Sequence, residues 1–172
     1  MKTLKASLLT IFFFTFFTIL PSNDAKAQEI GGSRSQSVYM EFLGNGLTYS
    51  LNYDTRFSNS HKGLGGRVGI GYISLVGNSL TSVPIVANYL FGQDKHYFEV
   101  GAGATLLAGA ASVDFGPGES RARGTAFIGT MSLGYRLEPQ DGGFLFRAGV
   151  TPIFDRSSFF PFWPQISFGY SF

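Results

Sequence analysis

The sequence predicts an eight-stranded antiparallel up-and-down transmembrane β-barrel, preceded by a cleaved signal peptide. In eight successive segments after residue 35, apolar residues recur at every second position, which is the period of a strand with one apolar face. Aromatic residues make up 16% of the 172-residue chain and glycines number 23, whereas charged residues reach only 14%, against about 25% in average proteins. After residue 27 the sequence contains no run of about 20 apolar residues, the length that a membrane helix needs. A closed barrel is the remaining way to satisfy backbone hydrogen bonds in lipid.

The N-terminal segment has the layout of a secretory signal peptide. Lys2 and Lys5 supply a positive start, residues 8–20 form an apolar run, and Ala25 and Ala27 are the small residues that a signal peptidase reads. The apolar run is too short for a membrane anchor. The expected division of the chain is a signal peptide over 1–27, a short periplasmic N-terminal segment over 28–36, and the barrel over 37–172.

The strands follow from the alternating runs, taken in chain order. These runs begin at Val38, Leu47, Val68, Val83, Phe98, Phe127, Phe144 and Ile166. They predict strands over 36–44, 46–57, 64–76, 79–92, 96–109, 123–138, 143–155 and 162–172. The last run is the clearest, because apolar side chains alternate with small or polar ones from Gln165 to Phe172. An even number of strands is typical of single-chain bacterial barrels.

Turn signals separate the strands. Asn45-Gly46 predicts a tight hairpin turn, and residues 110–122 are expected to form the longest loop. Pro84 and Pro164 indicate bulges or strand starts, because proline cannot donate to a β-ladder. With both termini in the periplasm, the exterior connections are expected at 44–46, 77–79, 110–122 and 156–161. The periplasmic connections are expected at 58–63, 93–95 and 138–143.

The polar face of each strand is expected to point inward, because an arginine or lysine at mid-bilayer on the lipid face costs about 2–4 kcal/mol. The predicted interior network consists of Glu41, Asp54, Arg56, Arg67, Glu99, Arg136 and Arg147. An eight-stranded barrel is only wide enough for its own side chains. A structural ion-pair network is therefore favoured over a narrow ion path or gate.

Composition and spacing argue against several kinds of chemistry. The chain has no cysteine, and once residues 1–27 are removed the 13 basic and 11 acidic residues become ten of each. A nucleic-acid-binding protein would show a basic excess. The sequence shows no cluster with metal-ligand spacing. Serines flank His61, but neighbours in one turn do not form a catalytic triad. His96 is interpreted as an anchor at the membrane interface. We therefore expect no enzymatic activity and no cofactor.

Two surface features could contact lipid or a ligand. The aromatic run over 159–164 is typical of the outer aromatic girdle of a barrel, and the alternative is a contact site for lipopolysaccharide or a partner. Arginine binds phosphate in a bidentate manner. The residues that could take part are Arg121, Arg123, Arg156 and Trp163.

Several stretches carry a family resemblance. These are residues 41–46 (EFLGNG), 49–54 (YSLNYD), Pro84 with 88–92 (NYLFG), and 99–103 (EVGAG). Phe168, Tyr170 and Phe172 resemble the C-terminal signal that the barrel-assembly machinery recognises. Over most of 37–172 the chain resembles small outer-membrane β-barrel proteins of the Bacteroidota type, grouped with porin-like and OmpA/OmpX-like barrels. The resemblance implies an eight-stranded barrel in the outer membrane of a Gram-negative cell, but it implies no activity.

The sequence leaves the role of the barrel open. The favoured interpretation is a non-enzymatic, packed barrel that supports the envelope or binds a surface ligand, in contact with outer-membrane lipid and lipopolysaccharide. The alternatives are a narrow pore for small solutes and a lipid-modifying enzyme. A soluble, lipocalin-like barrel would require the apolar face to point inward. The oligomeric state is also left open.

Overall fold

The computed structural model describes residues 34–75, 78–114 and 119–172. The predicted signal peptide lies outside the described residues, as does most of the predicted 28–36 segment. The elements, in chain order, are β1 (Gln36–Leu43), the short 3-10 helix η1 (Gly44–Gly46), β2 (Tyr49–Arg56), β3 (Gly63–Leu75), β4 (Asn78–Gln93), β5 (His96–Asp114), β6 (Glu119–Leu137), β7 (Gly143–Val150), β8 (Ile153–Phe154), β9 (Phe159–Phe160) and β10 (Pro164–Ser171).

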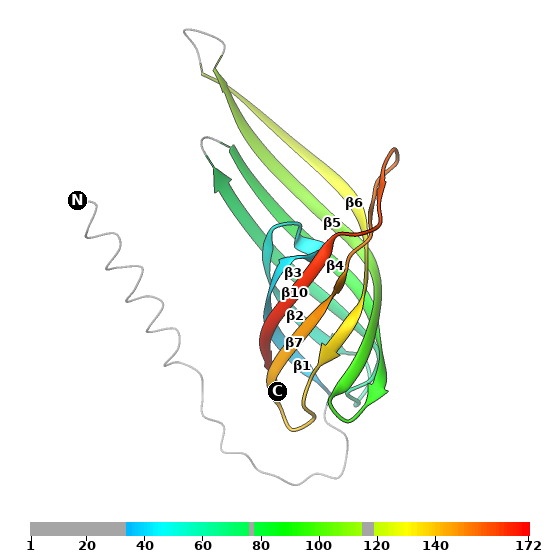
Figure 1. Cartoon of the computed structure of the whole chain (residues 1–172). Helices are drawn as coiled ribbons and strands as arrows, with labels where there is room; N and C mark the ends of the chain where they lie inside the picture. The colour runs from blue at the N-terminus through cyan, green and yellow to red at the C-terminus, as the bar shows by residue number, and fades with distance from the viewer. Residues whose placement is uncertain (1–33, 76–77, 115–118) are drawn as a thin grey trace, which may run out of the picture. The chain divides into compact units, whose positions relative to one another are not determined.

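The strands close into a barrel (Figure 1). From β1 to β7 each strand pairs antiparallel with the next, β7 pairs with β10, and β10 pairs back with β1. The short strands β8 and β9 extend one hairpin of this ring beyond its rim. The predicted eight-stranded antiparallel up-and-down barrel is thus confirmed.

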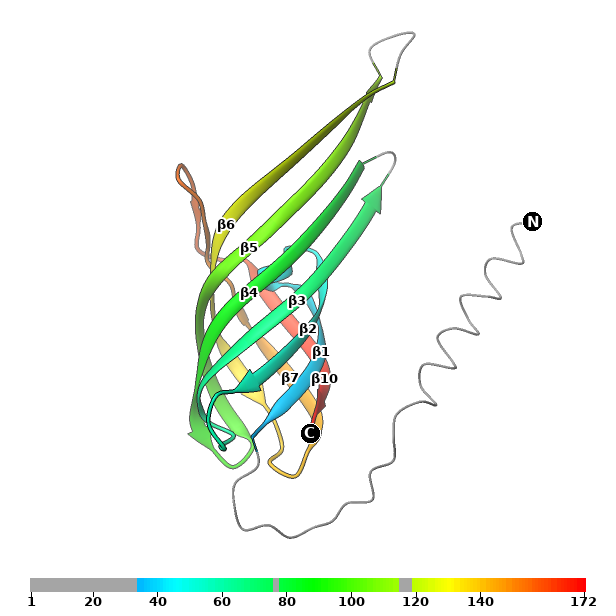
Figure 2. The same cartoon turned by 180° about the vertical axis from the view of Figure 1, so that it is seen from behind.

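The barrel has two ends with different connections. What we call the upper end holds η1, the end of β3 at Leu75, the end of β5 at Asp114, and the β8–β9 turn at 155–158. The lower end holds the connections 57–62, 94–95 and 138–142, together with the C-terminus (Figure 1). Figure 2 shows that β3, β4, β5 and β6 run well beyond β1, β2, β7 and β10 at the upper end.

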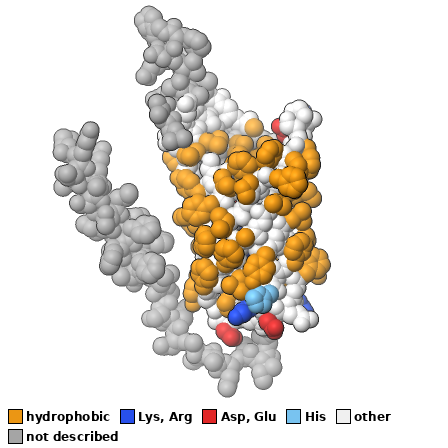
Figure 3. Space-filling view, viewed as in Figure 1, with side chains coloured by type: hydrophobic (Ala, Val, Ile, Leu, Met, Phe, Trp, Pro, Cys, Tyr) orange, Lys and Arg blue, Asp and Glu red, His pale blue; other side chains and the backbone are white. Residues whose placement is uncertain are grey.

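Side chains alternate between a buried polar set and an exposed apolar set. In β1, Ser37, Tyr39 and Glu41 are buried, whereas Val38 and Met40 between them are exposed. The same alternation holds along β2 and β10. Figure 3 shows the result on one face, where hydrophobic side chains cover the outer wall between the two ends. A soluble, lipocalin-like barrel requires the opposite arrangement.

The prediction of a long loop over 110–122 is wrong. β5 and β6 continue as paired strands to Asp114 and Glu119, which lie opposite each other. The sequence here is rich in Gly, Ala and Ser and lacks alternating apolar residues. Such alternation is needed only where one face of a strand meets an apolar environment, and this hairpin projects beyond the barrel wall. The same pairing places Arg121 and Arg123 on a strand rather than on a loop.

The last two predicted strands, over 143–155 and 162–172, are interrupted near prolines, which have no backbone donor. β8 continues the register of β7 on β6, because Leu133 faces Val150 and Gly129 faces Phe154. The predicted strand over 143–155 is therefore one strand interrupted at residues 151–152. The predicted strand over 162–172 starts instead at β9 and is interrupted at residues 161–163.

A one-residue bulge accompanies the second interruption. Ile153 lies opposite Phe160, and the Thr151 amide donates to the carbonyl of Trp163. Between these two contacts one strand advances by two residues and the other by three, so one residue is extra. Pro164 then starts β10, as its position predicted. Pro84 neither starts a strand nor marks a shift of register. It lies inside β4, where pairing with β3 stops at residues 83–84 and resumes in the same register.

Candidate functional site

The barrel interior is filled with charged side chains that balance one another. Four arginines and four acids are buried there among the described residues, each no more than 2% exposed. They are Arg56, Arg67, Arg136, Arg147, Glu41, Asp54, Glu99 and Glu138. All seven residues of the predicted interior network are in this set. Glu138 is the additional member, and with it the buried charges sum to zero.

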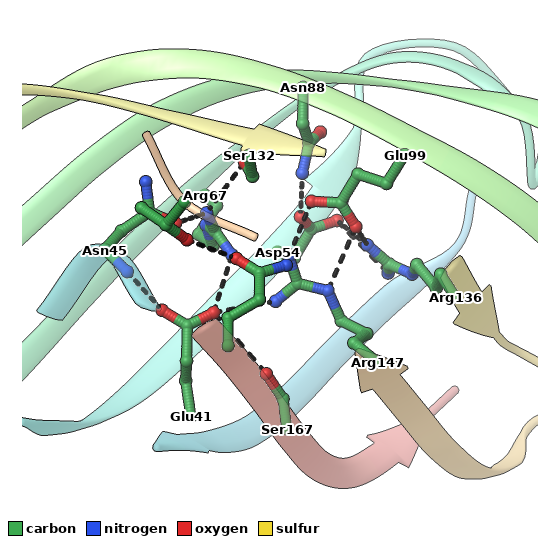
Figure 4. A network of polar contacts seen from close by, with 12 residues as sticks. Glu41, Asn45, Asp54, Arg67, Asn88, Glu99, Ser132, Arg136, Arg147 and Ser167 are labelled. Carbon is green, nitrogen blue, oxygen red and sulfur yellow. Dashed lines mark hydrogen bonds and ion pairs between the residues drawn. The ribbon is translucent and has the colours of Figure 1, made fainter. Parts of the chain in front are cut away.

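Arg147 and Glu99 form the most complete pair of the network (Figure 4). Arg147 on β7 donates from Nη2 to Glu99 Oε1 at 2.6 Å and from Nε to Glu99 Oε2 at 3.0 Å. This two-point geometry is the strong form of an arginine–carboxylate contact. The Arg147 guanidinium also lies 4.6 Å from the centre of the Tyr39 ring. It reaches Glu41 on β1 at 3.2 Å as well.

Arg136 joins several strands from its place on β6. Its Nη1 lies 3.5 Å from Glu99 Oε2, and its guanidinium lies 3.3 Å from Asp54 Oδ1 on β2. Nη2 donates to the Ser37 hydroxyl at 3.1 Å, and Nε contacts Glu138. One side chain thus connects β1, β2, β5 and β6 across the lumen.

Asp54 anchors the lower part of the network. It pairs with Arg56 on the same strand and accepts a hydrogen bond from the Asn88 amide at 2.5 Å. Arg56 in turn donates to Asn88 Oδ1 at 2.5 Å and to the carbonyl of Gly63 at 3.0 Å. Glu138 accepts a hydrogen bond from Ser35, which joins the start of the described chain to the network.

Arg67 closes the upper part of the network. Its Nη1 lies 3.1 Å from Glu41 Oε2 and 3.1 Å from the Tyr39 hydroxyl. Its Nη2 donates to the side-chain oxygen of Asn45 and, at 3.3 Å, to the Ser132 hydroxyl. Arg67 therefore links β1 and β3 to β6 on the far wall.

The turn between β1 and β2 folds into the barrel mouth instead of forming the predicted tight hairpin. Asn45 is completely buried. Its Nδ2 donates to Thr130 Oγ1 at 2.8 Å, its backbone amide donates to Glu41 Oε1 at 3.0 Å, and its carbonyl accepts from Thr105 Oγ1 at 2.7 Å. With the Arg67 contact, these bonds attach η1 to β1, β3, β5 and β6. We call η1 with Asn45 the inward turn.

Backbone strain accompanies the inward turn. Leu43 and Leu47, the residues on either side of η1, have φ values of 61° and 71°. Residues with a Cβ adopt positive φ rarely, and each such position costs on the order of 1–3 kcal/mol. The hydrogen bonds of Asn45 offset this cost, because they satisfy polar groups that would otherwise be buried without partners.

Tyr39, Glu138 and Asn45 belong to the interior network although the sequence analysis did not include them. Tyr39 shares its strand face with Ser37 and Glu41, and Glu138 shares its face with Arg136, so strict alternation could have placed both. Asn45 carries no such signal. Its Asn-Gly context predicts an ordinary hairpin turn, and its burial depends on partners distant in sequence.

Both histidines lie at the lower end of the barrel. Among the described residues, neither histidine forms a hydrogen bond with a serine side chain. His96 Nδ1 lies 2.6 Å from the Tyr135 hydroxyl, and His61 lies in the connection between β2 and β3. Within the described ranges, no group of three or more His, Cys, Asp or Glu side chains could hold a metal ion. The described residues also include no helix that is long and apolar enough to span a bilayer.

The predicted surface residues are spread over separate segments. Arg123 on β6 and Arg156 in the β8–β9 turn are exposed, and the side chain of Arg121 lies outside the described part. Trp163 is half-buried and packs edge-on against Phe160, with 6.0 Å between ring centres. Asp155 accepts backbone hydrogen bonds from Ser157 and Ser158, which lower the pKa of its carboxyl and order the turn that carries Arg156.

The aromatic residues of the last strand face outward. Phe168 packs against Phe144 and Phe146 of β7, with ring centres 6.4 and 5.4 Å apart. Tyr170 and Phe172 are exposed on the same side. These three side chains therefore form part of the outer wall and not of the interior network.

An apolar outer wall around a charged interior is the arrangement of transmembrane β-barrels, and one solved structure in particular has the same fold. The N-terminal β-barrel domain of Pseudomonas aeruginosa OprF matches with a TM-score of 0.59 and 12% identity, over 83% of this chain and 98% of that one. The outer membrane protein Ail of Yersinia pestis, in a phospholipid bilayer nanodisc, matches with a TM-score of 0.47 and 16% identity, over 82% of this chain and 99% of that one. No family model and no curated protein matches the sequence. The likeness to OprF establishes the fold, and the relationship to Bacteroidota barrels stays a prediction.

Proposed function

We propose that the protein is an integral outer-membrane β-barrel, exported through the periplasm, that is closed to solutes and has no enzymatic activity. The observation that carries this proposal is the combination of an apolar outer wall with a charge-balanced, fully buried interior. The first feature suits a lipid environment, and the second suits a barrel that serves as a scaffold.

The outer wall supports the membrane location. Large apolar side chains stay exposed on every barrel strand, and Phe127 and Phe162 reach 74% exposure. Monomeric soluble proteins rarely expose contiguous apolar patches above a few hundred Å². Lipid chains would cover this wall and remove the cost of exposing it to water.

The interior supports closure. A solute crossing the lumen would have to separate Arg136 and Arg147 from the acids on the opposite wall, and removing one partner of a buried pair costs about 3–5 kcal/mol. The inward turn adds a second obstruction at the upper mouth. The alternative of a narrow pore has no comparable observation in its favour.

The role would then belong to the outer surfaces of the barrel. The upper parts of β3, β4, β5 and β6 project past the rim, where they could contribute to envelope support or to binding a surface ligand. Outer-membrane lipid and lipopolysaccharide are the partners that the outer wall suits. We include the barrel-assembly machinery as a partner during biogenesis, with Phe168, Tyr170 and Phe172 as the residues that it would recognise.

Cell fractionation tests the location. We expect the protein in the outer-membrane fraction, lacking residues 1–27, and migrating faster on a gel before boiling than after boiling. Lipid A extracted from the same membranes should have the same mass with and without the protein, because we expect no lipid-modifying activity. A periplasmic species whose mobility does not change on boiling would contradict the membrane location.

A further inference from the structure

The outer face of the projecting sheet carries a hollow next to Arg123. The hollow has a volume of about 410 Å³ and is lined by Ser79, Ala108, Gly109, Ala110, Arg123, Gly124 and Thr125. Its floor is β5, which supplies only Ala108, Gly109 and Ala110 there. Small residues on two strands therefore create the hollow.

Strand register orders the residues of this face into rows across β4, β5 and β6. The rows are Ile85–Ala104–Gly129, Val83–Leu106–Phe127, Thr81–Ala108–Thr125 and Ser79–Ala110–Arg123. Successive rows are about 7 Å apart, since every second residue of a strand faces the same side. Ile85 and Phe127 are exposed members of the apolar wall, so this face changes from apolar to hydroxyl to cationic within three row spacings.

That sequence of rows matches the chemistry of a membrane lipid from its acyl chains to its headgroup. Arg123 differs from the four interior arginines, each of which has an acidic partner. The Arg123 guanidinium makes no ion pair and no hydrogen bond with any side chain that the structure describes. A guanidinium group offers several donors in the planar arrangement that binds phosphate oxygens, and the Ser79 and Thr125 hydroxyls lie on either side of the hollow as further donors.

We propose that this hollow binds the phosphate-bearing headgroup of a membrane lipid, with Arg123 on the phosphate and the acyl chains along the rows of Phe127 and Ile85. The inference rests on the proposed membrane location and adds a specific lipid site to it. A volume of 410 Å³ lies within the roughly 300–1,000 Å³ of small-molecule sites. This is more than a bare phosphate ion needs, and the adjoining apolar rows favour a lipid over the free ion.

The test measures lipid binding to the protein purified from the membrane in an uncharged sugar detergent. Phosphatidic acid is titrated and bound lipid is counted by native mass spectrometry, with diacylglycerol of the same acyl chains and inorganic phosphate as comparisons. Arg123→Gln should weaken phosphatidic acid binding about tenfold or more, the value of one charge-assisted hydrogen bond. Ala110→Leu should weaken it similarly, because it fills the hollow without changing charge.

Lys62→Gln is the matched control, since it removes one exposed positive charge at the lower end. It should leave binding unchanged, and diacylglycerol should bind more weakly than phosphatidic acid. Equal binding by Arg123→Gln and the wild type would overturn the site, as would equal losses in Arg123→Gln and Lys62→Gln. Equal binding of both lipids would show that phosphate is not recognised. Competition by inorganic phosphate at the concentrations where the lipid binds would assign the hollow to the free ion.

Each variant must also keep its heat-modifiable mobility, which shows that the barrel has folded. If the wild-type protein is absent from the membrane, the proposed function itself fails. If the barrel inserts normally and Arg123→Gln binds like the wild type, only the lipid site fails.

Discussion

At the scale of single residues, the interior depends on matched charges without access to water. Glu99 accepts hydrogen bonds from Arg147 through both carboxylate oxygens and lies beside Arg136 as well. Removing one charge leaves its partners buried and unbalanced, and this costs more than the pair itself contributes. The sequence could predict the members of the network, because charged residues alternate with apolar ones. It could not predict which acid meets which arginine, because the partners come from strands far apart in the chain.

Glu99→Gln tests the charge balance with little change in side-chain size. We expect it to lower the free energy of unfolding by about 3–5 kcal/mol. Urea unfolding followed by the fluorescence of Trp163, the single tryptophan, measures this change.

Asp141→Asn is the control for that experiment, because Asp141 is an exposed acid in the lower connection 138–142. Its midpoint should equal that of the wild type. A Glu99→Gln midpoint that also equals the wild-type midpoint would show that the buried pairs contribute nothing to stability.

At the scale of elements, alternation located the strands where one face meets an apolar environment. It failed for the upper parts of β5 and β6, because strands that project beyond the wall need no apolar face. It also failed for the inward turn, where local sequence favours a tight hairpin. There the bonds from Asn45 to Thr130, Thr105 and Arg67 outweigh the local preference.

Two substitutions in the inward turn should have opposite effects. Asn45→Ala removes buried hydrogen-bond partners and should destabilise the barrel by about 1–3 kcal/mol. Leu47→Gly removes the strain of a positive φ. Glycine has more freedom in the unfolded chain, which offsets part of this gain, so the net stabilisation should be up to about 1 kcal/mol. Urea midpoints of both variants measure the difference. If both variants destabilise equally, the strain at Leu47 is not a property of the folded protein.

At the scale of the whole molecule, a closed sheet encloses a narrow lumen, and the charges inside that lumen are balanced. The pairing of β1 with β10 leaves no open edge in the barrel wall, as a lipid environment requires. Among the residues that the structure describes, four buried arginines and four buried acids then fill a lumen that eight strands make narrow. The sequence predicted the fold and most of this inventory. Alternation from Arg136 would have included Glu138, but Glu138 follows the last residue of β6 and so lies outside the strand itself.

Conductance across a planar lipid bilayer tests the central claim, that the protein is a closed barrel, most directly. Protein purified from the outer membrane and shown to be folded by its heat-modifiable mobility is added to one side under an applied voltage. We predict no current steps, or only rare and small ones, because the ion pairs and the inward turn obstruct the lumen. Regular, long-lived steps from the folded wild-type protein would contradict the account and establish a continuous water-filled path through the barrel.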